Sequence, residues 1–284
     1  MSIVVTGATG HLGRHVVEQL LEKVPADQVT AVARTPEKVA DLAERGVRIA
    51  VADYSAPETF DGLFAAGDKV LLISGSEVGN DRVGQHRTVI EAAKAAGVAL
   101  LAYTSAPGTL TAALADDHRA TEEVLLASGV PYVLLRNGWY HENYTENLAP
   151  VLEHNAVTHA AGDGRISSAA RADYAAAAVA VLTGEGHENT TYELGGDVAW
   201  SMGEYAAELS RQTGREIADN PVSAEVLTGI LTGAGVPAPF AAVLAGVDTS
   251  VAKGELVVDS GDLSRLAGRP TTPLADAIAD ALKN

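Results

Sequence analysis

The chain has 284 residues, of which 47% are hydrophobic, so it can bury a full core in one large domain or two unequal ones. Acidic residues outnumber basic residues 37 to 20, and the formal net charge of -17 repels a nucleic-acid backbone, so we expect no nucleic-acid partner. Cysteine is absent, which excludes disulfides, thiolate nucleophiles and cysteine-ligated metals. Any redox chemistry must therefore come from a bound cofactor.

The start of the chain and its apolar runs predict a cytoplasmic protein with no membrane partner. The opening MSIVVTG has neither a basic flank nor a signal-peptide cleavage site. The longest uninterrupted apolar stretch, Tyr174 to Leu182, is too short to span a bilayer. The sequence leaves the oligomeric state open, with a homodimer among the options.

In the first half of the chain, short apolar runs alternate with helical patterns, which predicts a parallel sheet with crossover helices. The expected strands are Ile3–Thr6, Val29–Arg34, Val47–Asp53, Lys69–Ser74, Val98–Thr104 and Tyr132–Arg136. The expected helices are Leu12–Val24, Pro36–Glu44 with Thr35 as its cap, and Arg82–Ala96. Six such strands suffice for a doubly wound, Rossmann-type α/β domain.

The domain division follows from where this alternation stops. We expect residues 1–150 to form the Rossmann domain, and residues 170–196 to return to its sheet through a helix at Asp173–Leu182 and a strand at Thr190–Gly195. From Met202 onward the pattern is mostly helical and is broken by Gly and Pro residues. Residues 151–284 are therefore expected to form a smaller, mostly helical lobe on the substrate side.

The strongest chemical signal is the stretch Val4 to Gly13, VVTGATGHLG, which places a G-x-x-G-x-x-G loop between a strand and a helix. Gly7 and Gly10 allow a tight turn and a close approach of the backbone to a pyrophosphate, and Gly13 allows helix and strand to touch. The helix N-terminus supplies free N–H groups and the positive end of the helix dipole. The loop therefore predicts a dinucleotide site; the alternative is a turn without a ligand.

The residue after the second expected strand indicates which dinucleotide binds. About 20 residues beyond the loop, where an NAD-specific fold has an acid on the ribose hydroxyl, this chain has Arg34. A guanidinium there can bind the 2′-phosphate of NADP, with Lys38 adding charge, so the sequence favours NADPH over NADH. The alternative is a solvated residue at a strand end. Asp53 can accept from the adenine amino group or cap the following turn.

Five stretches of the chain carry a resemblance to a known family. They are Thr6–Gly13, residues 72–79 (LISGSEVG), Ala102–Ser105, Leu134–Tyr144 (LLRNGWYHENY) and Ala160–Ala178 (AAGDGRISSAARADYAAAA). Together they resemble the NmrA-like group of atypical short-chain dehydrogenases, and within it the NADPH-dependent quinone oxidoreductases. The resemblance runs over the whole chain.

The resemblance implies a set of cofactor residues, with residues 1–150 as the NADP-binding domain. The pyrophosphate and 2′-phosphate of NADPH would be held by Gly7, Ala8, Thr9, Gly10, His11, Leu12 and Arg34. The nicotinamide and acceptor site would be lined by Ser74, Gly75, Ser76, Asn137, Gly138 and Trp139, with Arg171 near it. Asp53 completes the candidate set.

Aromatic and amide residues follow the sixth expected strand, in a chain with only 5% aromatic residues. Trp139, Tyr140 and Tyr144 alternate there with polar residues, so a flat acceptor could stack on a ring with polar groups at its oxygens. We take Tyr140 and Asn143 as the candidate catalytic residues. Trp139 and Tyr144 can equally be core residues that anchor the next helix.

The Tyr-x-x-x-Lys pair of ordinary short-chain dehydrogenases is absent, and the stretch His118 to Glu122 stands in its expected place. That pair supplies the proton donor for ketone reduction, whereas hydride addition to a quinone leaves a delocalised phenolate that hydrogen bonds can stabilise. The sequence therefore favours a quinone over a ketone. His118 is either a proton donor or, as is commoner, a histidine on a helix surface.

Other constellations do not support a function. His11 and His15 are one helical turn apart but have no third ligand, so we expect no metal site. No G-x-S-x-G motif is present for serine hydrolysis. We therefore predict hydride transfer from NADPH to a small quinone. The alternatives are an NmrA-like regulator that senses the dinucleotide without turnover and a reductase of another conjugated carbonyl.

Overall fold

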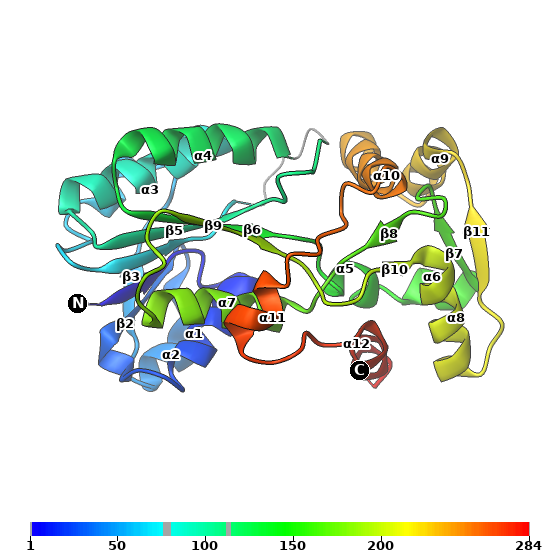
Figure 1. The fold of residues 1–284 in the computed structure, drawn as a ribbon, viewed down its shortest axis with the longest axis horizontal. Helices are drawn as coiled ribbons and strands as arrows, with labels where there is room; N and C mark the ends of the chain where they lie inside the picture. Colours follow the sequence, from blue (N-terminus) through cyan, green and yellow to red (C-terminus); the bar gives the residue numbers. More distant parts are fainter. Residues whose placement is uncertain (1, 76–80, 112–114, 284) are drawn as a thin grey trace. The chain divides into compact units, whose positions relative to one another are not determined.

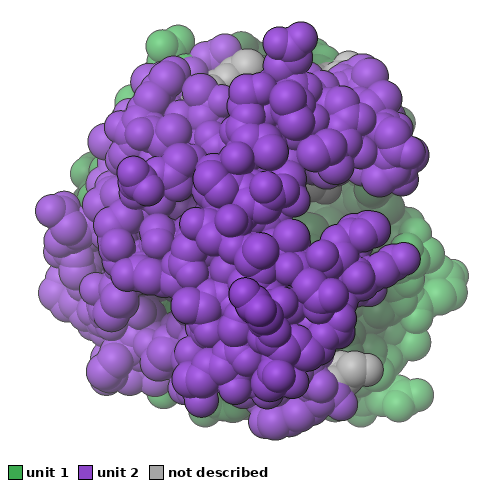
Figure 2. Space-filling model, turned by 90° about the vertical axis from the view of Figure 1, so that its right-hand side faces the viewer, with its two compact units in different colours: residues 1–106, 117–137, 171–192 green, residues 107–116, 138–170, 193–284 purple. Residues whose placement is uncertain are grey.

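The computed structural model describes residues 2–75, 81–111 and 115–283, so Ser76 lies outside the described residues. The chain divides into two compact units (Figure 2). Unit 1 comprises Met1–Ala106, Asp117–Asn137 and Arg171–Tyr192, and unit 2 comprises Pro107–Asp116, Gly138–Ala170 and Glu193–Asn284. Residues 138–150 thus belong to unit 2, and the segment Arg171–Tyr192 belongs to unit 1.

Unit 1 is built on a seven-stranded sheet with the order β3-β2-β1-β4-β5-β6-β9 (Figure 1). Its strands are β1 (Ile3–Val5), β2 (Val29–Ala33), β3 (Arg48–Val51), β4 (Lys69–Leu72), β5 (Leu100–Ser105), β6 (Tyr132–Asn137) and β9 (Thr190–Leu194). Neighbouring strands from β3 to β6 pair in parallel. The order reverses between β1 and β4, as in doubly wound dinucleotide-binding folds, so the predicted fold class is confirmed.

Helices cover both faces of this sheet (Figure 1). One face carries α1 (His11–Leu20), α2 (Ala40–Glu44) and α7 (Arg171–Thr183), and the other carries α3 (Arg82–Ala96) and α4 (Asp116–Ser128). Short 3-10 turns form at η1 (Ala26–Gln28), η2 (Pro36–Val39) and η3 (Pro57–Phe60). The stripe that α1 buries has the 3.6-residue period read from the sequence and consists of Leu12, Gly13, Val16, Val17 and Leu20.

Two predicted helices have different bounds in the structure. α1 ends at Leu20. The amides of Glu22 and Lys23 donate to carbonyls three residues back, and Pro25 disfavours a helical Val24. The expected helix at residues 36–44 is a 3-10 turn followed by α2. Thr35 is the N-cap of this turn and Pro36 its first residue, as predicted, although the Thr35 side chain makes no capping hydrogen bond.

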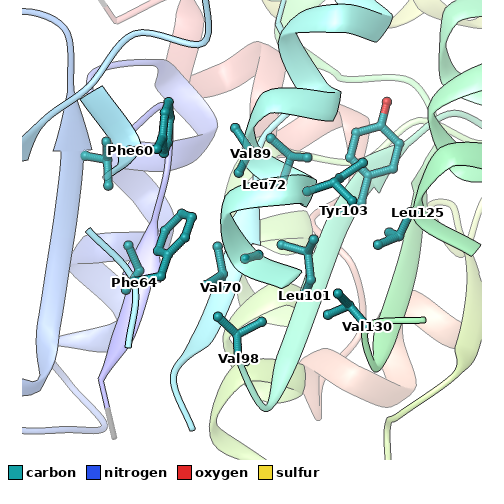
Figure 3. Close-up of a cluster of buried hydrophobic side chains, with 14 of the residues drawn as sticks. Phe60, Phe64, Val70, Leu72, Val89, Val98, Leu101, Tyr103, Leu125 and Val130 are labelled. Atoms are coloured by element: carbon teal, nitrogen blue, oxygen red, sulfur yellow. The ribbon is translucent and has the colours of Figure 1, made fainter. Parts of the chain in front are cut away.

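A cluster of buried hydrophobic side chains packs the sheet of unit 1 against α3 (Figure 3). β4 contributes Val70 and Leu72, β5 contributes Leu101 and Tyr103, and α3 contributes Val89. Burying a large apolar side chain stabilises a fold by about 1.5–3 kcal/mol. This packing holds β4 and β5 in place, and the chain that follows β4 carries candidate site residues.

Unit 2 is mostly helical, as predicted for the C-terminal lobe, and contains two small sheets. Its helices are α5 (Glu142–Thr145), α6 (Ala149–His154), α8 (Met202–Thr213), α9 (Ala224–Gly233), α10 (Ala238–Ala252), α11 (Asp262–Ala267) and α12 (Leu274–Ala281). β7 (Ala156–His159) pairs in parallel with β11 (Ala218–Pro221), and β8 (Arg165–Ile166) pairs antiparallel with β10 (Trp200–Ser201). Over the described ranges, no helix of either unit has both the length and the apolarity for a membrane crossing.

Candidate functional site

The G-x-x-G-x-x-G loop joins β1 to α1 with the geometry that its spacing predicts. Gly7 has a φ of +63°, in the left-handed region that favours glycine. Gly10 is the N-cap of α1, which has neither a capping side chain nor an acidic residue in its first turn. Thr9, Gly10 and His11 are exposed. The first amides of α1 can therefore meet an anion without competition from a carboxylate.

Gly13 packs closely on the loop itself rather than on strand β1. A Cβ atom at Gly13 would lie 2.3 Å from the carbonyl oxygen of Gly7 and 2.9 Å from the Cα of Ala8, so only glycine fits. The side chains of Ala8 and Leu12 are buried in the core of unit 1. These two residues can contact a dinucleotide only through their backbones.

Arg34 directly follows β2 and is exposed, as is Lys38. β2 pairs with β1, so this cation stands at the carboxyl edge of the strand next to the glycine loop. Burial raises the pKa of the Tyr54 phenol, while a hydrogen bond with Thr6 and the charge of Arg34 oppose the rise. Arg34 and Tyr54 therefore share the surroundings of this loop.

Asp53 caps a turn after β3. Its carboxylate accepts the backbone N–H of Ser55 at 2.9 Å, and its backbone forms an isolated bridge with Ala56. The capping alternative from the sequence describes this geometry. An additional contact to adenine stays a prediction.

Ser74 and Gly75 follow β4 at the same edge of the sheet. The Ser74 amide donates to Oγ1 of Thr104 at 2.9 Å, and the Thr104 hydroxyl donates to the Ser74 hydroxyl at 3.3 Å. The Ser74 O–H therefore keeps its own hydrogen for donation to another group. Asn137, the buried last residue of β6, lies two strands along. Unit 1 thus brings the glycine loop, Arg34, Ser74, Gly75 and Asn137 to one edge, where ligands of open α/β sheets bind.

The candidate catalytic residues belong to unit 2. Tyr140 forms an isolated bridge with Ala169, and its carbonyl accepts the backbone N–H of Asn143 at 3.2 Å. Asn143 is exposed and Tyr140 is half-buried. Gly138 donates its N–H to the carbonyl of Leu194 at 2.7 Å. The two candidate side chains therefore project from one turn whose backbone is held on both sides.

His141 lies within this turn and is held at both ring nitrogens. Nε2 lies 2.9 Å from the carbonyl of Thr272 and must donate to it, so Nδ1 accepts from the Ser168 hydroxyl at 2.8 Å. Ser168 also accepts from the indole N–H of Trp200 at 2.8 Å. His141 is 2% exposed, so it orders the turn that carries Tyr140 and is not placed to donate to a substrate.

Tyr144 packs into an aromatic cluster of unit 2. Its ring centroid lies 5.0 Å from that of Trp200 and 5.8 Å from that of Tyr205, whose hydroxyl donates to the Tyr144 carbonyl at 2.8 Å. Burial raises the pKa of Tyr144, the charge of Asp248 adds to the rise, and a hydrogen bond with Trp139 opposes it. Tyr144 is half-buried, and its ring contacts with Trp200 and Tyr205 agree with the alternative of a residue that anchors the chain.

His118 is 8% exposed, so its interpretation as a surface histidine is wrong. It lies on the buried side of α4, with Nδ1 2.9 Å from the Tyr103 hydroxyl and Nε2 3.2 Å from Nη2 of Arg82. Burial, followed by the charges of Arg82 and His86, lowers its pKa to about 3. A neutral ring that accepts from Arg82 beneath a helix has no role in proton donation to an acceptor.

Ser105 and Glu122 form a second buried polar link under α4. The Ser105 hydroxyl donates to Glu122 at 2.6 Å, and Arg136 donates to both carboxylate oxygens at 2.9 and 2.7 Å. This link ties α4 to β5 and β6. Ser105 is therefore committed to the fold and not to nucleophilic chemistry.

Sequence reasoning missed Arg82 and His86, two polar residues on the buried stripe of α3. Their spacing is that of an apolar helix face, and the stripe consists of Arg82, His86, Val89, Ile90 and Ala93. The available signal for these two residues was that polar side chains occupy positions of the helix where apolar ones are expected.

In the described part of the chain, no group of three or more histidine or acidic side chains could hold a metal ion.

Comparison with known proteins covers nearly the whole chain. Residues 7–185 match the model of the NAD(P)H-binding family. The chain is 47% identical over 279 residues to quinone oxidoreductase 2 of Escherichia coli strain K12, which spans 98% of this chain and 97% of that protein. It is 29% identical over 293 residues to an NmrA-like family domain-containing oxidoreductase of Aspergillus flavus, which spans 99% of this chain and 95% of that protein.

Two solved structures with bound cofactor have the same fold. The NADPH complex of an Escherichia coli NADPH-dependent quinone oxidoreductase matches with a TM-score of 0.95 and 46% identity, over 99% of this chain and 100% of that one. The NADP(H) complex of Citrobacter sp. triphenylmethane reductase matches with a TM-score of 0.94 and 40% identity, over 99% of this chain and 100% of that one. The chain therefore belongs to the NAD(P)H-binding family, among NmrA-like and quinone-oxidoreductase relatives, as its sequence resemblance predicted.

Proposed function

We propose that this protein reduces small quinones with NADPH. The observation that carries the proposal is the 47% identity to quinone oxidoreductase 2 of Escherichia coli, which extends over 98% of this chain. A relative that is similar along its full length retains both the cofactor edge of the sheet and the C-terminal lobe. The sequence features of the glycine loop and Arg34 support the same cofactor independently.

The residues at the sheet edge of unit 1 fit NADPH. α1 begins at the exposed residues Gly10 and His11, and its N-cap has no side chain that could occupy the helix end, which suits a pyrophosphate. Arg34 supplies a cation at the end of β2, where an NAD-specific fold has an acid. The O–H of Ser74 is available to donate to an oxygen on the nicotinamide half. These residues would hold the cofactor, which when bound supplies a hydride.

The acceptor chemistry suits a site without a strong acid. Quinone reduction needs one hydride and one proton in total. Hydride addition leaves a phenolate, whose negative charge is delocalised over an aromatic ring. Tyr140 and Asn143 are proposed to donate hydrogen bonds to the acceptor oxygens. No Tyr-x-x-x-Lys pair is available to protonate an alkoxide, and the buried His118 does not replace it. The proposal therefore favours quinones over simple ketones.

A steady-state assay tests this proposal. NADPH consumption, followed by absorbance, should be rapid with a benzoquinone or a naphthoquinone and slow with simple ketones and enones. A protein that binds NADPH but reduces no acceptor in this panel would be a dinucleotide sensor instead. Faster turnover with ketones than with quinones would contradict the proposed acceptor class.

A second acceptor class has a specific observation in its favour. The chain is 40% identical to Citrobacter sp. triphenylmethane reductase over 99% of its length. We therefore propose that conjugated cationic triphenylmethane dyes are secondary acceptors, since they accept a hydride at a central carbon whose positive charge is delocalised. Decolorisation of a triphenylmethane dye that depends on NADPH tests this, and its absence would restrict the acceptor to quinones.

A further inference from the structure

The backbone of the short segment Ile73–Gly75 is hydrogen-bonded to side chains of other elements. It follows β4 and is neither helix nor strand. The amide of Ile73 donates to Oγ1 of Thr6 at 3.2 Å, and its carbonyl accepts from the Tyr54 hydroxyl at 2.9 Å. Thr6 precedes the glycine loop directly. Side chains from other elements thus take the part that backbone partners play in a strand.

The peptide groups of Gly75 are held in the same way by two residues of α3. The Gly75 amide donates to Nε2 of His86 at 2.9 Å, and its carbonyl accepts from Nε of Arg82 at 2.9 Å. Both side chains are buried, with exposed fractions of 0% for His86 and 5% for Arg82. With the bond from Ser74 to Thr104, five backbone groups of this segment are fixed by five side chains.

The hydrogen-bond directions at His86 are determined by its surroundings. Because Nε2 accepts from Gly75, Nδ1 must carry the hydrogen and donate to Oγ1 of Thr121 at 2.9 Å. Thr121 then donates to the carbonyl of Asp117 at 2.7 Å. Burial and the charge of Arg82 lower the pKa of His86 to about 4, which keeps Nε2 an acceptor at neutral pH.

Arg82 is anchored on its far side by α4. Its Nη1 lies 3.2 Å from the carboxylate of Asp117, and its Nη2 donates to Nε2 of His118 at 3.2 Å. Together with the bond from Nε to the Gly75 carbonyl, these contacts commit the guanidinium to Gly75 and to α4. Because Arg82 and His86 are both buried, their contacts with Gly75 belong to the interior of unit 1.

We propose that His86 and Arg82 are positioning residues for the nicotinamide half of NADPH. They act through the Gly75 peptide, which they fix so that Ser74 presents its hydroxyl and backbone at the sheet edge. This inference rests on the proposed function, because it assumes that Ser74 and Gly75 face the nicotinamide side. Preorganised backbone lowers the entropy lost on binding, so loosening Gly75 should weaken the cofactor without changing any group that touches it.

A pair of matched variants separates positioning from packing. In His86→Asn, the amide can still reach Thr121 from the place of Nδ1 but is too short to accept from Gly75. In His86→Gln, the longer amide can again accept from Gly75. We expect His86→Asn to weaken NADPH binding by about 3- to 10-fold, the effect of one neutral hydrogen bond, and His86→Gln to restore most of it.

A comparison of NADPH with adenosine 2′,5′-bisphosphate identifies which half of the cofactor the substitution affects. Adenosine 2′,5′-bisphosphate contains the adenine and the 2′-phosphate but no nicotinamide. Its affinity, measured by calorimetry, should be the same for wild type and His86→Asn. An equal loss for both ligands would show a general structural role and overturn the proposal, as would unchanged NADPH binding in a folded His86→Asn protein.

A second variant keeps the test available if His86→Asn does not fold. Thr121→Val is close to isosteric and removes the acceptor of the Nδ1 hydrogen. The tautomer of His86 that leaves Nε2 as an acceptor for the Gly75 amide is then no longer favoured. This variant should weaken NADPH selectively, and equal effects on both ligands would again overturn the proposal. These are binding measurements, so a wild-type protein that binds NADPH but reduces no quinone would remove the proposed function while leaving the positioning role intact.

Discussion

The hydroxyl of Tyr103 lies 2.9 Å from Nδ1 of His118, in a layer that α4 covers. The opposite nitrogen of the ring accepts from Arg82, whose guanidinium is always charged. Nδ1 must therefore donate to Tyr103. Burial and the adjacent cation keep this histidine neutral, and His86 beside it is in the same state, with pKa values of about 3 and about 4.

These two depressed pKa values predict a loss of stability in mild acid. Below the ordinary histidine pKa of about 6.5, these two histidines are protonated in the unfolded chain but not in the native state. The free energy of unfolding therefore has its full value above about pH 6.5 and decreases as the pH is lowered from there. The fall continues to about pH 4 for His86 and about pH 3 for His118. At about pH 5, each histidine should have lowered the free energy of unfolding by about 2 kcal/mol relative to its value at neutral pH.

Urea unfolding of wild type and His118→Asn at about pH 7 and about pH 5 measures this effect. The difference between the two pH values should shrink by about 2 kcal/mol in the variant, because one of the two groups no longer titrates. The carboxylates titrate alike in both proteins and cancel in this comparison. Identical pH dependence would mean that His118 is not buried as a neutral ring.

Arg34 should set the preference for NADPH. A charge-assisted contact with phosphate contributes about 1.5–3 kcal/mol, so Arg34→Ala should weaken NADPH binding by roughly 10- to 100-fold and leave NADH binding nearly unchanged. Arg34→Asp should go further, since its carboxylate repels the phosphate and can accept from a free ribose hydroxyl. Titration of both cofactors checks this. Parallel losses for NADH and NADPH would assign Arg34 to the fold, and an unaltered NADPH affinity would point to Lys38.

Tyr140 and Asn143 should affect turnover and not cofactor affinity. Tyr140→Phe and Asn143→Ala each remove a donor that is proposed to face the acceptor oxygens, which could raise the barrier by about 2–4 kcal/mol. Asn143 is exposed, so its replacement leaves the core of unit 2 intact. Steady-state kinetics with a naphthoquinone, together with NADPH titration, test both variants. Unchanged turnover in both would place the acceptor groups elsewhere.

Gly13 should be irreplaceable, in contrast to a glycine in an open helix position. Gly13→Ala would place a Cβ 2.3 Å from the Gly7 carbonyl oxygen, so the loop must move, at a cost of about 1–3 kcal/mol in stability and with loss of NADPH binding. Gly229→Ala is the matched control, because no atom lies within 4 Å of its added Cβ in α9. It should stabilise the protein by about 0.5–1 kcal/mol.

Thermal unfolding and NADPH titration of these two glycine variants give the readouts. If Gly13→Ala keeps the melting temperature and NADPH affinity of wild type, the loop is not packed as the structure describes. If Gly229→Ala is instead destabilising, the space around α9 is occupied.

The fold and the conformation of the glycine loop could be predicted because their signals are local in sequence. Alternating apolar runs located the strands of the sheet in unit 1, and the spacing of Gly7, Gly10 and Gly13 identified a turn between strand and helix. The positive φ at Gly7 agrees with the predicted tight turn, but Gly13 packs on the loop, where the sequence had predicted a contact between helix and strand. The ends of elements were less accurate, as at the C-terminal end of α1, where the apolar period continues to Val24 but the helix ends at Leu20.

The roles of the buried polar residues required the tertiary structure. His118 reads as a surface residue in a charged stretch, yet α4 presents it to Tyr103 and to Arg82, which is 36 positions away in the chain. His86 and Arg82 each make one hydrogen bond with the backbone of Gly75, just after the end of β4. A helical period indicates which residues share a face, but it does not say what that face packs against.

The sequence by itself therefore determined the class of fold, the dinucleotide loop and the cation beside it, since each depends on residues that are neighbours along the chain or one crossover apart. Only the tertiary structure decided which polar groups serve the fold. His118 is a candidate proton donor in the sequence, but it is committed to buried hydrogen bonds, as are His141 and Ser105. A buried polar side chain must find a partner, and that partner is set by packing between distant segments, which no local pattern encodes.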